Sequence, residues 1–283
     1  MRQIVIISGK GGTGKTVITA SFAAIAESKV MADCDVDAAD LHLLLTPEIK
    51  EKGFLKSGKT AEIDPDKCVK CGKCLEVCRF RAVQSNFVID PVSCEGCSFC
   101  SLVCPERAIS MRENVTGEWF VSNTRFGPMV HAKLGIAEEN SGKLVNIVKS
   151  KAKELAQNNG ARFVIVDGAP GIGCPVIASI SEADIALIVT EPTISGMHDA
   201  DRVIKVARHF SVPIKLTINK YDLNMDMSDI IEDYCRKNNI DVVGKVPFDE
   251  VVVEAMVSGK TIIEYSAGKT AQIIKKIWNS VSS

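Results

Sequence analysis

The sequence contains few aromatic residues, few histidines and little net charge. Aromatic side chains make up 5% of the 283 residues, and the four histidines show no ligand spacing. No apolar run reaches the roughly 18 residues that a transmembrane helix needs, so we expect no stable membrane association. The formal net charge of −1 gives no overall attraction to nucleic acid or to an anionic membrane. We therefore expect no nucleic-acid partner.

Cysteine is abundant, with eleven residues. Secreted disulfide scaffolds also contain many cysteines, but such chains are short and follow a signal peptide. This chain is long, and its opening residues MRQIVIISGK are typical of a buried strand that enters a loop. We therefore expect a cytoplasmic protein whose thiolates are reduced and bound to metal.

Most of the chain alternates between apolar strands and amphipathic helices. This alternation predicts an α/β fold with a mostly parallel sheet and helices on both faces. The predicted strands are Ile4–Ser8, Val30–Cys34, Arg162–Val166, Ile185–Thr190, Ile214–Ile218 and Val242–Val246. The predicted helices are Val17–Glu27, Leu144–Gln157, Met197–Arg208, Ser228–Asn238 and Thr270–Ser280. A hairpin is expected over Trp119–Val121 and Pro128–Ala132.

The middle of the chain differs in composition and carries the one clear internal repeat. Residues 48–60 are charged and show no long apolar period, and residues 61–113 hold eight cysteines. We predict one domain over residues 1–60 and 114–283, interrupted by a small inserted domain over residues 61–113. That segment has too few apolar residues for a core of its own, so bound clusters are expected to hold it together.

The eight cysteines form two runs with the spacing C-x2-C-x2-C-x3-C, which is that of a bacterial two-cluster ferredoxin. The runs are Cys68, Cys71, Cys74 and Cys78, then Cys94, Cys97, Cys100 and Cys104. The spacing predicts two 4Fe–4S clusters that carry single electrons. Zinc is the alternative, because paired C-x2-C groups also bind zinc.

In such ferredoxins the fourth cysteine of each run binds the other cluster. This resemblance implies a first cluster on Cys68, Cys71, Cys74 and Cys104. It implies a second cluster on Cys94, Cys97, Cys100 and Cys78. One departure is Arg79, which stands where a ferredoxin usually has proline.

A phosphate-binding loop lies near the start of the sequence, before the two cysteine runs. Residues Gly9 to Thr16 match G-x-x-x-x-G-K-[ST] at every position, between an apolar strand and an alanine-rich helix. The glycines let backbone N–H groups approach a phosphate, and the following helix directs its positive end at the anion. Lys15 is predicted to reach the β- and γ-phosphates, and Thr16 to bind Mg²⁺. The predicted nucleotide-binding residues here are Gly11, Gly12, Thr13, Gly14, Lys15, Thr16 and Val17.

Because Lys10 adds a second lysine, the loop resembles the deviant phosphate loop of the MinD/ParA ATPases, K-G-G-x-G-K-[ST]. The resemblance covers residues 1–45 and 114–270. It implies a Mg²⁺-dependent ATPase that forms a nucleotide-dependent homodimer, in which Lys10 reaches the partner's nucleotide. The resemblance also implies that Lys10 and Lys15 are both catalytic residues.

Other segments carry the same resemblance. Asp33-Cys34-Asp35 resembles the family's D-x-D segment, which implies that Asp35 orients the attacking water and that Asp33 lies near the metal. Asp167, after the strand Val164–Val166, is implied to hold Mg²⁺ through water. Asn219-Lys220 is similar to the adenine-side motif. Val246-Pro247 and Gly259-Lys260 resemble the late loop around the base.

Three departures leave alternatives open. Asp40 stands where the family usually has asparagine. Asn219 to Asp222 also reads N-K-x-D, the guanine-reading pattern, although the rest favours ATP over GTP. The apolar stripe in Gln272–Trp278 is either a core face or a membrane or partner contact.

The three remaining cysteines have no ligand spacing of their own. Cys34 and Cys235 are expected to be core residues. Cys174 follows Asp167 at a spacing similar to that of a cluster ligand in the nitrogenase iron protein. Whether it is a structural thiol or a cluster ligand stays open.

Three functions are consistent with these patterns. The first is an ATPase that couples nucleotide state to electron transfer to a redox partner. The second is an ATPase of metallocofactor assembly or carriage, and the third is a positioning protein whose clusters are structural or redox-sensing. An ATP effect on electron-transfer rate would distinguish the first, and cluster transfer to an apo-protein the second. Partner binding that survives replacement of Lys15 would favour the third.

Overall fold

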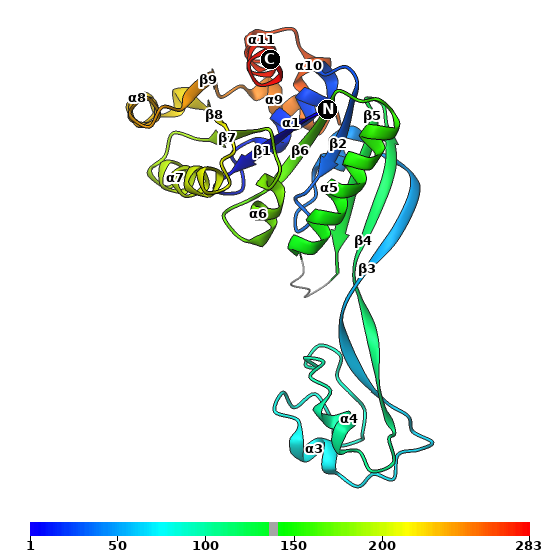
Figure 1. Cartoon of the computed structure of the whole chain (residues 1–283). Coiled ribbons are helices and arrows are strands. Elements are labelled where there is room, and N and C mark those ends of the chain that lie inside the picture. The colour runs from blue at the N-terminus through cyan, green and yellow to red at the C-terminus, as the bar shows by residue number, and fades with distance from the viewer. Residues whose placement is uncertain (136–140) are drawn as a thin grey trace. The chain divides into compact units, whose positions relative to one another are not determined.

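The computed structural model describes residues 1–135 and 141–283, and the chain divides into two compact units (Figure 1). The large unit comprises Met1–Gly53, Trp119–Lys133 and Ser141–Ser283. The cysteine unit comprises Phe54–Glu118 and a short segment that begins at Leu134. Two long strands, β3 and β4, continue from one unit into the other. The identity of the cysteine unit as an iron–sulfur domain stays a prediction.

The strands form one nine-stranded sheet in the order β3-β4-β5-β2-β6-β1-β7-β8-β9. Their bounds are β1 Arg2–Ser8, β2 Lys29–Asp33, β3 Glu48–Ile63, β4 Ile109–Thr124, β5 Gly127–Leu134, β6 Phe163–Pro170, β7 Ile185–Thr190, β8 Ile214–Asn219 and β9 Asp241–Val246. From β5 through β9 in this order, every neighbouring pair is parallel. The predicted α/β fold with a mostly parallel sheet is confirmed.

Helices cover both faces of the large unit's sheet. They are α1 Lys15–Ile25, α2 Leu41–Leu45, α5 Ser141–Asn158, α6 Cys174–Ile180, α7 Ile194–His209, α8 Met225–Lys237, α9 Glu250–Val257, α10 Ile262–Tyr265 and α11 Lys269–Ser282, with a 3-10 turn at Tyr221–Leu223. Helix α1 packs beside α10 and α11, while α5, α6 and α7 lie on the opposite face (Figure 1). Among the described residues, none of these helices combines the length and apolarity needed to cross a bilayer.

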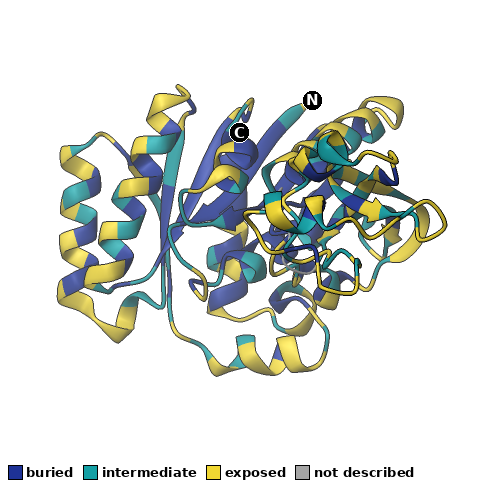
Figure 2. Cartoon of the chain, turned by 90° about the horizontal axis from the view of Figure 1, so that it is seen from below, coloured by how far each residue is buried: buried dark blue, intermediate teal, exposed yellow. Residues whose placement is uncertain are grey.

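The central strands are buried on both faces, which explains their continuous apolar sequence. Figure 2 shows them in dark blue, flanked by helices whose outer faces are exposed. Ile4 and Ile6 point into the core shared with α1 and α11, where the rings of Phe22 and Trp278 lie 5.2 Å apart. Ile274, Ile277 and Trp278 belong to this core. The apolar stripe of the last helix is therefore a core face.

The cysteine unit repeats its own backbone at an offset of 26 residues. Helix α3 spans Lys73–Val77 and α4 spans Phe99–Val103. Each half donates an equivalent backbone hydrogen bond to the other. The Asp64 N–H donates to the Ala108 carbonyl, and the Asp90 N–H donates to the Ala82 carbonyl. The sequence duplication is thus a structural duplication.

Strand β3 differs from the sequence-based expectation, which assigned no regular element to residues 48–60. The strand runs from Glu48 to Ile63, and most of its side chains are exposed. Its neighbour in the sheet is β4. Strand β3 lies at the edge of the sheet and most of its residues are charged or polar, so the sequence carried no apolar alternation to indicate it.

Candidate functional site

The loop between β1 and α1 is closely packed against the end of β8. Gly14 has φ 89°, and a Cβ built there would lie 2.3 Å from Asn219 Nδ2. That amide donates to the Thr13 carbonyl at 2.8 Å, and Lys220 Nζ donates to the Gly12 carbonyl at 3.2 Å. The structure thus brings Asn219 and Lys220 onto the loop, and their adenine-side role stays a prediction.

Lys15 is buried at the start of α1 and is surrounded by carboxylates. Its Nζ lies 2.9 Å from Asp167 Oδ1 and 3.3 Å from Asp35 Oδ2. Burial alone would lower the pKa of Lys15, but the two carboxylates outweigh it and raise this pKa. A phosphate would therefore have to compete with these carboxylates for the ammonium group.

Asp33 lies beneath this cluster, at the end of β2, in register with Asp167 on β6. Its side chain is fully buried, and burial together with the charge of Asp167 raises its pKa well above the ordinary value. Burial also raises the pKa of Asp35, against the opposing charge of Lys15. Among the described residues, Asp33 Oδ2 and Thr13 Oγ1 are two of three buried side-chain polar atoms without a hydrogen-bond partner. Such atoms fit a site that is completed by a ligand.

The residues predicted to hold Mg²⁺ are adjacent. Thr16 Oγ1 donates to Asp167 Oδ2 at 2.9 Å, so both oxygens could serve one coordination sphere that phosphate and water complete. Thr19 Oγ1 donates to Asp167 Oδ1 at 2.9 Å and fixes the carboxylate. The sequence analysis missed Thr19, because an ordinary helical threonine carries no distinguishing pattern.

A cavity of about 490 Å³ extends from the loop toward β9, α9 and α11. It is lined by Ser8, Gly11–Ile18, Asp35, Ala38, Asp40, Pro170, Asn219, Lys220, Val246–Asp249, Val252, Val253, Met256, Thr270 and Ile274. Gly259 and Lys260 are not among the lining residues, and the Gly259 carbonyl accepts from Arg125 instead. The end of the cavity near β9, α9 and α11 is mainly apolar, which suits the flat ring of a nucleotide base.

Asp222, the last residue of the N-K-x-D pattern, does not line this cavity. Its Oδ1 accepts a hydrogen bond of 2.7 Å from the Phe248 N–H and so holds the β9–α9 loop. A guanine-reading aspartate must instead face the base.

Lys10 lies outside the cavity, in contact with the loop after β7. Its Nζ lies 2.6 Å from Glu191 Oε1 and 3.1 Å from Ser195 Oγ of the same chain. The cross-dimer role of Lys10 stays a prediction. Glu191 was missed as its partner, since a contact between residues so far apart in sequence leaves no local pattern.

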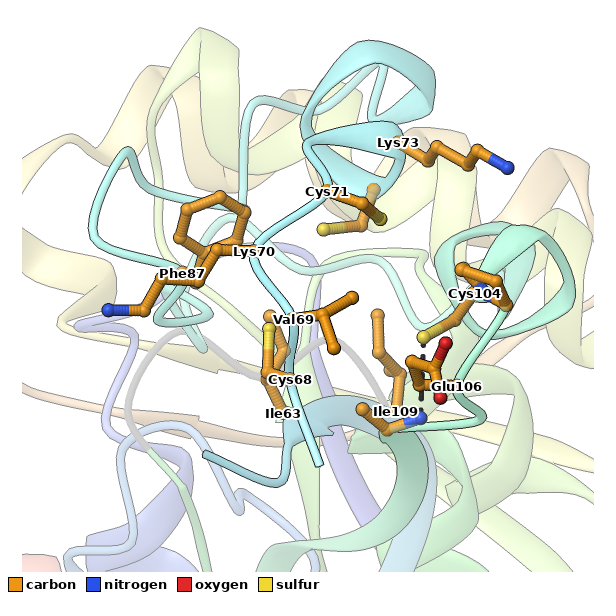
Figure 3. Close-up of a pocket in the computed structure, with 13 residues that line it drawn as sticks. Ile63, Cys68, Val69, Lys70, Cys71, Lys73, Phe87, Cys104, Glu106 and Ile109 are labelled. Carbon is orange, nitrogen blue, oxygen red and sulfur yellow. Dashed lines mark hydrogen bonds between the residues drawn. The ribbon is translucent and has the colours of Figure 1, made fainter. Parts of the chain in front are cut away.

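The cysteine unit contains two cavities, and each is lined by four cysteines. One is lined by Cys68, Cys71, Cys74 and Cys104 (Figure 3). The other is lined by Cys78, Cys94, Cys97 and Cys100. Each cavity thus combines three cysteines of one run with the fourth of the other, which is the grouping that the ferredoxin spacing implies.

Backbone N–H groups donate hydrogen bonds to several of these sulfur atoms. The Ala108 N–H donates to Cys104 Sγ at 3.3 Å, and the Ala61 N–H donates to Cys94 Sγ at 3.5 Å. For Cys78, burial raises the pKa, but backbone N–H groups of residues 80–83 outweigh it and lower this pKa. Such donors stabilise thiolates, the form in which cysteine binds metal.

In residues 1–135 and 141–283, no three His, Cys, Asp or Glu side chains lie close enough to hold one metal ion together. The binding of 4Fe–4S clusters or of zinc by these cysteines stays a prediction.

The other three cysteines lie in the large unit. Cys34 and Cys235 are buried, as expected, and burial raises the pKa of Cys235 to about 11. Cys174 is exposed at the start of α6. None of the residues around it in the described chain forms a metal-binding group with it.

The fold and the phosphate loop define a P-loop nucleotide-binding protein. The chain matches the family model described as the CobQ/CobB/MinD/ParA nucleotide binding domain over residues 4–262. It belongs to this family. It is 34% identical, over 99% of its length and 96% of the relative's, to an uncharacterised protein of Methanocaldococcus jannaschii.

Two solved structures show the same fold. The MinD cell division protein of Aquifex aeolicus has a TM-score of 0.59 at 20% identity, covering 99% of this chain and 97% of that one. The septum site-determining protein MinD of Pyrococcus horikoshii, complexed with Mg-ADP, has a TM-score of 0.60 at 17% identity, covering 99% and 95%.

Proposed function

We propose that this chain is a Mg²⁺-dependent ATPase that carries two 4Fe–4S clusters and couples its nucleotide state to electron transfer to a partner protein. The observation that carries the proposal is the pair of four-cysteine cavities in a chain that also has a complete phosphate loop. The clusters would supply reversible one-electron transfer, because every iron has a thiolate and none is open to a substrate.

The nucleotide cavity supports ATP as the ligand. Its base end is mainly apolar, and the aspartate that would read guanine is engaged with Phe248. Asn219 and Lys220 lie between the phosphate loop and the base end.

Hydrolysis is assigned to residues at the phosphate end of the cavity. Lys15, released from Asp35 and Asp167 by the incoming phosphates, would stabilise the charge on the β- and γ-phosphates. Asp35, freed by the same exchange, would orient the attacking water. Thr16 and Asp167 would hold Mg²⁺, directly and through water, with Asp33 beneath them. Lys10 would leave Glu191 to reach the nucleotide of a second copy when a homodimer closes.

The chain offers a short covalent connection from this site to the cysteine unit. Asp35 and Asp40 line the nucleotide cavity, α2 begins at Leu41, and β3 begins at Glu48 and continues into the cysteine unit. A nucleotide-dependent shift of residues 35–45 would act directly on β3.

The experiment compares electron transfer from the reduced protein to an acceptor with ATP, ADP and no nucleotide. We expect the rate to depend on the nucleotide, and Lys15→Ala to remove the dependence while the brown chromophore stays. Equal rates in all three conditions would refute the coupling. Bleaching by Lys15→Ala would refute the separation of the two sites.

Cluster or metallocofactor assembly is the second candidate. Cys71 and Cys97 are exposed, one beside each cavity, so each cluster would have an accessible thiolate. Transfer of iron and sulfide to an apo-protein, with loss of the donor's visible absorbance, would favour this role over electron transfer.

A further inference from the structure

The two cysteine loops share a backbone but differ in their surfaces. The left-handed positions coincide at the 26-residue offset: Lys70 with Gly96, Gly72 with Ser98, and Arg81 with Arg107. Yet residues 66–81 contain five basic and two acidic residues, whereas residues 92–107 contain one basic and two acidic residues. The first loop carries Lys67, Lys70 and Lys73 where the second carries Ser93, Gly96 and Phe99. The duplication therefore keeps the cluster scaffold and changes what surrounds it.

Lys70 and Lys73 line the cavity of Cys68, Cys71, Cys74 and Cys104, and both are exposed. Figure 3 shows their ammonium groups on opposite sides of the cysteines, turned away from the cavity. No ion pair holds either one in the described part of the chain, whereas Lys67 pairs with Asp64 at 2.9 Å. Glu106 is the one carboxylate among the lining residues.

Lys70 also occupies a backbone conformation that favours glycine. Its φ is 55°, and its counterpart in the second loop is Gly96, with φ 64°. A lysine is strained there and a glycine is not. Lys70 therefore adds a positive charge at this position at the cost of backbone strain.

The second cavity has a different rim. It is lined by Phe80 and Phe99, which are 48% and 52% exposed, and its one charged lining residue is Glu95. Arg79 and Arg81 flank Phe80 in the sequence but do not line the cavity. The two cavities thus present unlike surfaces to a partner.

We infer that the lysine face, formed by Lys70 and Lys73 on either side of the cysteines of the first cavity, docks a small acidic electron-transfer protein, and that electrons pass between the partners at this cavity. The inference rests on the proposed binding of 4Fe–4S clusters. Opposite charge around a redox centre raises the association rate and orients the centres toward each other. The exposed Cys71 lies within this face, so a docked partner would cover the nearest cluster thiolate.

The test uses the full-length protein with its clusters assembled anaerobically, and flavodoxin as the acidic acceptor. The double variant Lys70→Glu/Lys73→Glu is compared with Arg79→Glu/Arg81→Glu, which changes the net charge equally next to Phe80, a lining residue of the other cavity. Stopped-flow rates are measured from low to high salt. We expect the lysine variant to lower the low-salt rate by about tenfold or more and to flatten the salt dependence. The arginine variant should stay within about twofold of the parent.

Iron content and dithionite reduction of each variant are measured first. A parent protein without iron would overturn both the proposed function and this inference. If both double variants contain their clusters and reduce flavodoxin as fast as the parent, or lose rate to the same extent, only the docking face would be overturned. Lysine-dependent binding to phosphatidylglycerol vesicles without an effect on the flavodoxin rate would also overturn it, in favour of a membrane surface.

Discussion

At the scale of single residues, the nucleotide site depends on buried side chains of opposite charge, each of which offsets the cost of burying the others. Lys15 neutralises part of the charge of Asp35 and Asp167, while Asp33 has its pKa raised beneath them. Breaking a buried pair of this kind leaves an uncompensated charge. Lys15, Asp35 and Asp167 therefore stabilise one another in this buried site.

Gly14 gives a prediction about the loop itself. Gly14→Ala places a Cβ 2.3 Å from Asn219 Nδ2 at φ 89°. We expect it to destabilise the nucleotide-free protein by roughly 1–3 kcal/mol, measured by denaturant unfolding. Gly11→Ala is the matched control for stability, since nothing lies within 4 Å of its Cβ. The double variant Gly14→Ala/Asn219→Ala should recover part of the loss. Equal stability of the two single variants would contradict the packing described here.

At the scale of elements, long-range contacts hold the return from β4 to β5 in place. Arg125, in this turn, donates to both carboxylate oxygens of Glu264 in α10 through one edge of its guanidinium, from Nε at 2.8 Å and from Nη2 at 2.9 Å. It also donates to the Thr46 hydroxyl and the Gly259 carbonyl. This one side chain joins the turn to the α2–β3 and α9–α10 connections.

The Arg125–Glu264 contact predicts an acid-sensitive stability. Hydrogen bonds from Arg125 lower the pKa of Glu264 to about 2. A lowered pKa means that the stabilisation is present above the unfolded-state value of about 4.3 and is lost as the pH falls toward 2. Glu264→Gln should lower the melting temperature at neutral pH and abolish this loss. Glu48→Gln, at an exposed pair, should change neither. An unchanged acid transition in Glu264→Gln would contradict the assignment.

The cysteine loops predict which cysteines share a cluster. Cys104 lines the cavity of Cys68, and Cys94 lines the other. Cys68→Ser/Cys104→Ser should therefore keep one cluster, about four irons per chain, whereas Cys94→Ser/Cys104→Ser should lose both. The opposite result would show that each run binds its own cluster. Cys174→Ser should leave the iron content unchanged.

Local patterns in the sequence predicted the elements that carry a local signal. The strand Ile4–Ser8 and the last helix were confirmed by β1 and α11, because a short continuous apolar run indicates a buried strand and an amphipathic repeat indicates a helix. The exposed strand β3 was missed, since pairing with β4 rather than burial stabilises it. The contact of Lys10 with Glu191 could not be predicted either, because it depends on how β1 and β7 are placed by the sheet.

At the scale of the whole molecule, one chain joins a nucleotide unit and a cysteine unit through β3 and β4. The large unit has an extensive apolar core of its own. The small core of the cysteine unit includes Cys74 and Cys100 themselves, with Cys78, Cys94 and Cys104 packed against it. The stability of the cysteine unit should therefore depend on what its thiolates bind, and that of the large unit should not.

The most direct test is iron and acid-labile sulfide analysis of protein purified without oxygen. The proposal predicts about eight irons and eight sulfides per chain, with the absorbance of 4Fe–4S clusters. Zinc in their place, or far less iron, would contradict it and leave a MinD/ParA-family nucleotide-binding protein with a cysteine-rich insertion.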